Sequence, residues 1–125
     1  MQRRVLLSER YDIHVVGGGP GGLEAARVAQ QRGHTVTLFE KSGELGGQYI
    51  IAGFPPHKNE MKDAAHHLGY RAQKAGVDIH LYTEATPERI QAFQPDVIIV
   101  ATGSEPLIPR IPGVEQDHVF EARKV

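Results

Sequence analysis

The chain has 125 residues, of which 40% are apolar and 23% are charged, and its formal net charge is −1. This composition predicts one soluble globular domain, and the low net charge provides no overall basic field to attract nucleic acid or an anionic membrane. The absence of cysteine excludes disulfides, thiolate nucleophiles and cysteine-ligated zinc or iron–sulfur sites from this chain. No apolar run approaches the roughly 20 residues of a membrane span, so we expect a cytoplasmic protein.

The first predicted elements form a βαβ unit. Apolar and β-branched residues at 13–16 predict a buried strand, which ends in five glycines within residues 17–22. Residues 21–32 are rich in helix-forming residues and stop at Gly33, and residues 35–39 predict a second strand. A strand, a tight turn, a helix and a strand in this order predict a right-handed crossover.

The middle of the chain continues the alternation of strands and helices. Residues 41–57, with four glycines and two adjacent prolines, predict an ordered but irregular loop. Asn59 is the expected N-cap of an amphipathic helix that runs to Gly76. A strand at 77–82, a short helix that begins with Pro87 and a strand at 96–103 follow. This pattern predicts a parallel sheet covered by helices on both faces. We therefore expect a Rossmann-like, doubly wound, three-layer α/β fold, with the strand order 3-2-1-4 of the dinucleotide-binding fold.

The end of the chain differs in composition from the rest. Three prolines within residues 106–112 exclude a central strand or a helix, so we expect an extended excursion. The elements predict one domain that finishes in this excursion rather than at a closed fold boundary.

The glycine run has a pattern that favours nucleotide binding. Gly17, Gly19 and Gly22 match GxGxxG between a predicted strand and a predicted helix. The first glycine allows a sharp turn, the second lets the backbone approach a pyrophosphate, and the third lets the helix pack closely on the strand. The N–H groups and the positive dipole end of the helix would attract the same anion. The alternative is a structural turn that binds nothing.

An acidic residue follows the second predicted strand. Glu40 stands 23 positions after Gly17, where a carboxylate can accept hydrogen bonds from a ribose. Because a carboxylate there repels a 2′-phosphate, we expect FAD, NAD or ADP rather than NADP. Lys41 either supplies a positive charge beside Glu40 or is a solvated surface residue.

Three segments resemble the FAD/NAD(P)-binding domain of pyridine nucleotide-disulfide oxidoreductase-like flavoproteins. They are VVGGGPGGLEAA at 15–26, LFEKSGELGGQ at 38–48 and DVIIVATGSEPLIPRIPG at 96–113. The sequence is most similar to the carboxyl-terminal portion of the group that contains NADPH-dependent 2,4-dienoyl-CoA reductase and trimethylamine dehydrogenase. The resemblance extends from Tyr11 to Gly113, and it implies one incomplete dinucleotide-binding domain over residues 11–113 with flanking segments at 1–10 and 114–125. Gly21 stands where this family usually has alanine.

The resemblance implies that five short stretches of the chain bind FAD or ADP. The implied contacts are Gly17, Gly19, Pro20 and Gly22 around the pyrophosphate, Glu40 at the ribose with Lys41 beside it, Gly46, Gly47 and Gln48 along the dinucleotide, Ala85 at the adenine, and Ala101, Thr102 and Gly103 over the nucleotide. A tight loop is the alternative for 46–48, and a simple strand exit is the alternative for 101–103.

The resemblance also implies parts that this sequence lacks. In the reductase group, a barrel domain with FMN and an iron–sulfur cluster precedes this region, and further nucleotide-binding sequence follows it. We therefore expect a fragment or remnant of an NAD(P)H-dependent flavin oxidoreductase, without a catalytic side chain of its own. Surfaces left exposed by the missing domains would allow self-association.

Two other functional classes remain open for this sequence. One is a non-catalytic module that binds ADP or NAD, or a truncated remnant without activity. The other is a plain NAD-dependent dehydrogenase domain, which GELGGQ and ATG disfavour. The seven histidines do not suggest a metal site, since His66 and His67 are adjacent and would point apart on a helix. We expect no nucleic-acid or membrane partner.

Overall fold

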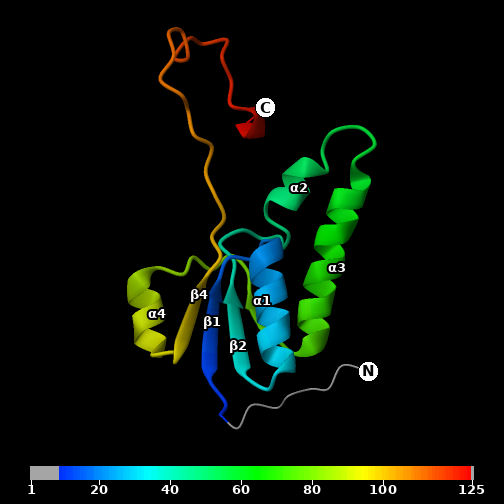
Figure 1. Ribbon diagram of the computed structural model, residues 1–125, viewed down its shortest axis with the longest axis vertical. Helices are drawn as coiled ribbons and strands as arrows, with labels where there is room; N and C mark the ends of the chain where they lie inside the picture. The colour runs from blue at the N-terminus through cyan, green and yellow to red at the C-terminus, as the bar shows by residue number, and fades with distance from the viewer. Residues whose placement is uncertain (1–8, 125) are drawn as a thin grey trace.

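The computed structural model describes residues 9–124, and its centre is a parallel sheet with the strand order β3-β2-β1-β4 (Figure 1). The elements are β1 (Asp12–Val16), α1 (Pro20–Gln31), β2 (Thr35–Phe39), α2 (Gln48–Ala52), α3 (Asn59–Ala75), β3 (Asp78–His80), α4 (Pro87–Phe93), β4 (Val97–Val100) and a short 3-10 helix (Ala122–Lys124). The predicted Rossmann-like fold and strand order are confirmed.

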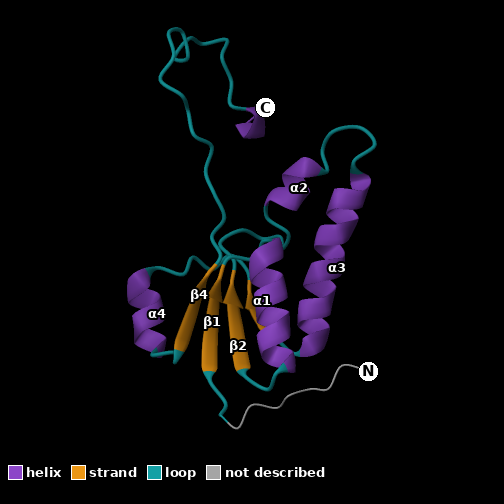
Figure 2. Ribbon diagram, viewed as in Figure 1, coloured by secondary structure: helices purple, strands orange, loops and turns teal. Residues whose placement is uncertain are grey.

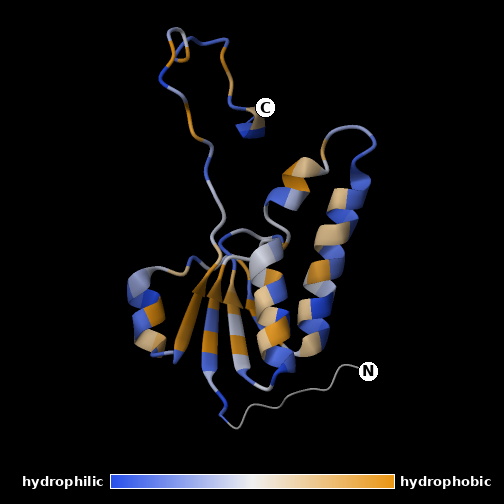
Figure 3. Ribbon diagram, in the orientation of Figure 1, coloured by the Kyte–Doolittle hydropathy of each residue, from blue (hydrophilic) through white to orange (hydrophobic). Residues whose placement is uncertain are grey.

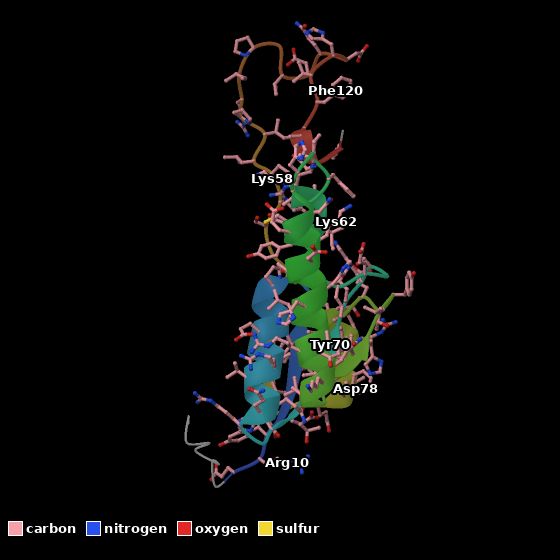
Figure 4. All side chains as sticks on the ribbon, turned by 90° about the vertical axis from the view of Figure 1, so that its right-hand side faces the viewer. Arg10, Lys58, Lys62, Tyr70, Asp78 and Phe120 are labelled. Carbon is pink, nitrogen blue, oxygen red and sulfur yellow. The ribbon has the colours of Figure 1, made fainter. Side chains whose placement is uncertain are left out.

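One face of the sheet is covered by α1 and α3, which lie side by side in both Figure 1 and Figure 4. Alternate strand residues point to this face, and Val15 and Leu38 on it are fully buried. Leu23 and Ala26 of α1 and Ala72 of α3 complete the same hydrophobic core. Tyr70 lies on the outer, exposed side of α3, whereas Lys62 is partly buried and its ammonium lies 4.2 Å from the centroid of the Phe54 ring (Figure 4).

The other face of the sheet is covered only in part, by the short helix α4. The alternate residues His14 and Phe39 point to this face and pack against Phe93 of α4, with ring centroids 5.5 and 5.9 Å from that of Phe93. Because α4 has only seven residues, Ile98 and Val100 of β4 stay 48% and 73% exposed. Figure 3 shows that β4 is hydrophobic along its whole length.

Four predicted elements differ from the observed ones, and one of them is the strand predicted at 96–103, which is paired only at Val97–Val100. The predicted loop 41–57 contains the short helix α2. Its sequence did not indicate a helix, because two of its five residues are isoleucines and β-branched residues are only moderate helix formers. The N-cap of α3 is Lys58 rather than Asn59, and no side chain caps this helix. The predicted strand 77–82 is paired only at Asp78–His80, because the chain turns at Tyr82, which has a left-handed φ of 50°.

Residues 103–121, called the arm below, have no helix or strand and extend beyond the carboxyl ends of the strands (Figure 2). Leu107 is 92% exposed and Phe120, at the far end in Figure 4, is 72% exposed. After the arm, the chain returns toward its base, where Arg123 Nη1 donates a hydrogen bond to the carbonyl oxygen of Ser104 at 2.9 Å. The predicted extended excursion is therefore confirmed.

Across residues 9–124, no helix combines the length and the apolar character that crossing a membrane would require.

Candidate dinucleotide-binding site

The glycine turn connects β1 to α1 in a space where two of its glycines cannot carry a side chain. Gly17 has a φ of 111°, and a Cβ there would lie 2.3 Å from the carbonyl oxygen of Ala101. A Cβ on Gly22 would lie 1.9 Å from the carbonyl oxygen of Gly17. Both clashes involve backbone atoms, which cannot rotate away. Gly17 and Gly22 are therefore required by the packing of α1 against the ends of β1 and β4.

Two other glycines of the turn face open space. The nearest atom to a Cβ on Gly19 would be the Cα of Gly47 at 4.0 Å, and a Cβ on Gly21 would meet nothing within 4 Å. Gly19 is the N-cap of α1 with an extended conformation (φ −76°, ψ −178°), and no side chain caps the helix there. Pro20 follows as the first helical residue. The fold itself thus does not require glycine at position 19, and the helix start is left open to a ligand.

A second glycine-rich segment, residues 43–48, packs against the turn. The N–H of Gly46 donates to the carbonyl oxygen of Gly18 at 2.8 Å. Gly46 has a φ of 123°, and its Cβ would lie 2.5 Å from the Cβ of Ala65 in α3. Gly47 has a φ of 54°, and its Cβ would lie 3.0 Å from the Cα of Gly19. The segment therefore fits between the turn and α3 only because these side chains are absent.

Glu40 lies at the end of β2 beside the turn. Its Oε2 accepts a hydrogen bond from the N–H of Gly18 at 2.7 Å, and its Oε1 accepts one from the N–H of Ser42 at 2.8 Å. These two charge-assisted bonds orient the carboxylate, since both oxygens are held by backbone groups. Each oxygen keeps further acceptor capacity for a ligand hydroxyl. Lys41 is exposed next to it.

A hollow of about 190 Å³ opens at the carboxyl ends of the strands. This edge of an open parallel sheet is where ligands bind in α/β proteins. The hollow brings together five predicted contacts from four separate segments. It is lined by Val16, Gly17, Phe39, Glu40, Lys41, Thr83, Glu84, Ala85 and Thr102.

The remaining predicted contacts lie around this hollow but do not line it. Gly19, Pro20 and Gly22 form the start of α1, and Ala101 packs over Gly17 and Gly22. Gly47 lines a separate, neighbouring hollow, and Gly46 is buried against α3. Gln48 and Gly103 lie on the arm side, where Gln48 Nε2 donates to the hydroxyl of Ser104 at 3.2 Å.

Several residues of this region were not predicted from the sequence. Gly18 binds the Glu40 carboxylate and the 43–48 segment at once, although it occupies a variable position of GxGxxG. A Cβ there would lie 2.9 Å from a Leu45 methyl group, and the run of consecutive glycines was the available signal. Thr83 and Glu84 line the hollow beside Ala85, but no motif marks them.

In residues 9–124, no group of three or more histidine, aspartate or glutamate side chains is placed to hold a metal ion.

Comparison with known families gives one match over almost the whole chain. Residues 11–125 match the family described as "Pyridine nucleotide-disulphide oxidoreductase". Among curated relatives, bilirubin reductase of Mediterraneibacter gnavus is 47% identical over 117 residues, which cover 94% of this chain and 18% of that protein. NADH oxidase of Thermoanaerobacter brockii is 46% identical over 108 residues, which cover 86% of this chain and 17% of that protein.

Solved structures agree with this family match. A 2-naphthoyl-CoA reductase, solved with 2-naphthoyl-CoA, aligns with a TM-score of 0.86 and 36% identity, over 92% of this chain and 17% of that one. Histamine dehydrogenase from Rhizobium sp. 4-9 aligns with a TM-score of 0.76 and 28% identity, over 83% of this chain and 16% of that one. The chain thus spans less than a fifth of the length of these relatives. Its fold, its glycine turn and these matches show that the chain belongs to the pyridine nucleotide-disulphide oxidoreductase family, as an FAD/NAD(P)-binding domain.

Proposed function

We propose that the chain binds the ADP half of FAD, or ADP itself, as part of an NAD(P)H-dependent flavin oxidoreductase. One observation carries the proposal: Gly19 is free of steric demand from the protein, at an uncapped helix start beside a hollow that contains Glu40. A phosphate at such a helix start is stabilised by backbone N–H groups and the helix dipole. The glycine turn then serves as the pyrophosphate site.

The hollow suits part of a nucleotide rather than a whole cofactor. Its volume of about 190 Å³ is below the roughly 300–1,000 Å³ of pockets that enclose a complete ligand. In this proposal Glu40 binds the ribose, and the backbone near Ala85 contacts the adenine. Gly46, Gly47, Gln48 and residues 101–103 would lie along the remainder of a longer dinucleotide.

The residues that surround the proposed site bind and orient the cofactor. FAD, when bound, would supply the hydride and electron chemistry. Glu40 orients the ribose and disfavours a 2′-phosphate through charge repulsion, and the turn holds the diphosphate. We propose no catalytic side chain in this domain. The full-length relatives are named as a reductase and an oxidase, which favours a redox role for the protein that contains this domain. FMN and an iron–sulfur cluster remain predictions for sequence outside this chain.

Titration calorimetry with ADP, FAD, NAD and NADP tests the proposal. We expect ADP and FAD to bind in the micromolar range and NADP to bind at least about ten-fold more weakly, because one pair of like charges is worth about 1.4 kcal/mol here. Binding of ADP without FAD would support the non-catalytic module. Tight NAD binding without FAD would support the plain dehydrogenase domain, and no binding at all would contradict a nucleotide site.

We also propose self-association through the thinly covered face of the sheet. Ile98 and Val100 share this face with the half-exposed ring of Phe93, and contiguous apolar surface of this kind favours protein contacts. Light scattering across a concentration series should show oligomers, and Val100→Lys should shift the chain toward the monomer. A concentration-independent monomer would contradict the proposal. A cytoplasmic location stays a prediction, which localisation of a tagged chain would test.

A further inference from the structure

Tyr82 has a backbone conformation that bulky residues rarely adopt. Its φ is 50°, and its side chain is 82% exposed, so burial does not explain why a tyrosine stands there. A left-handed backbone conformation is sterically unfavourable for a non-glycine residue and persists only where its surroundings hold it. Its N–H donates to the carbonyl oxygen of Ser42 at 2.9 Å, so the strained residue is tied to the segment after β2.

The ring of Tyr82 lies over Gly43. A Cβ on Gly43 would lie 2.1 Å from the Tyr82 hydroxyl oxygen and 2.2 Å from the ring carbon that bears it. Gly43 does not have a positive φ, so its backbone conformation does not require glycine. The absence of a side chain at Gly43 therefore makes room for the tyrosine ring.

This contact lies next to the groups that orient Glu40. The N–H of Glu40 donates to the carbonyl oxygen of His80, and the N–H of Thr83 donates to that of Glu40, both at 2.9 Å. The chain after β3 thus bulges at Leu81 and Tyr82 and then pairs with the end of β2 again. Within the segment that Tyr82 contacts, the N–H of Ser42 holds Oε1 of Glu40 at 2.8 Å.

We propose that Tyr82 is a positioning residue that clamps residues 42–43 and thereby orients the Glu40 carboxylate. Because that carboxylate repels a 2′-phosphate, the clamp sets the selectivity of the site for an unmodified ribose. The inference rests on the proposed nucleotide site for its effect on selectivity. The clamp itself is a property of the ligand-free chain.

Two variants remove the ring contact by different routes. Tyr82→Gly deletes the ring and relieves the left-handed strain, whereas Gly43→Ala displaces the ring without altering Tyr82. Tyr82→Phe retains the ring and is the matched control. The readout is the ratio of the dissociation constants of adenosine 2′,5′-bisphosphate and ADP, measured by calorimetry. We expect this ratio to fall about 5-fold in both clamp variants, a coupling typical of contacting residues, and to be unchanged in Tyr82→Phe.

A second measurement separates this inference from the proposed function. Amide hydrogen exchange of the ligand-free chain reports the N–H groups of Gly18 and Ser42, which bind the Glu40 carboxylate. We expect exchange at both to accelerate in Tyr82→Gly and Gly43→Ala while the β1 amides stay protected. Unchanged exchange at Gly18 and Ser42 would overturn the clamp, whether or not nucleotides bind. Faster exchange with an unchanged ratio of the two dissociation constants would overturn the role of Tyr82 in nucleotide selectivity. Failure of the wild-type chain to bind either nucleotide would count against the proposed function and not against the clamp.

Discussion

The turn at residues 17–22 and the segment at residues 43–48 are both rich in glycine, yet they use glycine differently. In the turn, Gly17 and Gly22 allow α1 to pack close to β1 and β4, and of the turn's glycines only Gly17 also has a positive φ. In the second segment, Gly46 and Gly47 have positive φ angles, which allow an irregular path between the turn and α3. Each segment also contains a glycine without such a demand, Gly19 in the turn and Gly43 in the segment. A glycine pattern in a sequence therefore mixes structural positions with positions that leave room for something else.

Among the glycine substitutions that test this difference, Gly22→Ala should have the largest effect on stability. Its methyl group would lie 1.9 Å from a backbone oxygen, so α1 must move away from the sheet. We expect a loss of about 3 kcal/mol or more in the free energy of unfolding. Urea unfolding followed by circular dichroism measures it. Wild-type stability in this variant would show that the turn does not pack as described.

Gly19→Asp should separate binding from folding. Aspartate is a better N-cap than glycine, so the stability of α1 should be kept or raised by about 0.3 kcal/mol. The added carboxylate would occupy and repel the phosphate position, so we expect ADP affinity to fall at least about 30-fold, or roughly 2 kcal/mol. Calorimetry and thermal unfolding measure the two effects, and ADP binding as in the wild type would place the phosphate elsewhere.

Gly47→Ala should have an intermediate effect on stability. Its φ of 54° and ψ of −126° lie outside the regions open to alanine, and strain of this kind costs about 1–3 kcal/mol. Differential scanning calorimetry should show a lower Tm. Gly43→Ala is the matched control within the same segment, because the three atoms nearest to its methyl group all belong to the movable Tyr82 side chain. Equal Tm values for the two variants would contradict the distinction.

Gly21→Ala should have the smallest effect, in the opposite direction. Gly21 lies in the first turn of α1 with open space around it, and alanine there reduces the entropy lost on folding. We expect a gain of about 0.5 kcal/mol in stability, with ADP binding unchanged. Ala25→Gly in the same helix is the reverse control and should lose a similar amount. A lower stability of the Gly21→Ala variant would mean that there is no free space for a side chain at this position of α1.

The parts of the fold that depend on local signals could be predicted from the sequence. The strands β1 and β2 and the helices α1 and α4 follow from periodicity and from glycine and proline positions. The observed strand order is that of the dinucleotide-binding fold, which the glycine turn indicates. Local signals were weaker for α2, whose five residues include two isoleucines and follow a glycine pair. The early end of β3 was also not predicted, because no residue near Tyr82 indicates that this tyrosine has a left-handed conformation.

By itself, the sequence determined that the chain has a strand–turn–helix with the spacing of a phosphate-binding turn and an acid at the end of the next strand. These features are local, so neighbouring residues suffice to specify them. Only the tertiary structure decided which glycines are required by packing, that Gly18 and Ser42 hold Glu40, and that Ala85 and Thr102 line the same hollow. Each of these depends on contacts that form only when the parallel strands assemble and bring their carboxyl ends together, and no short stretch of sequence contains that information.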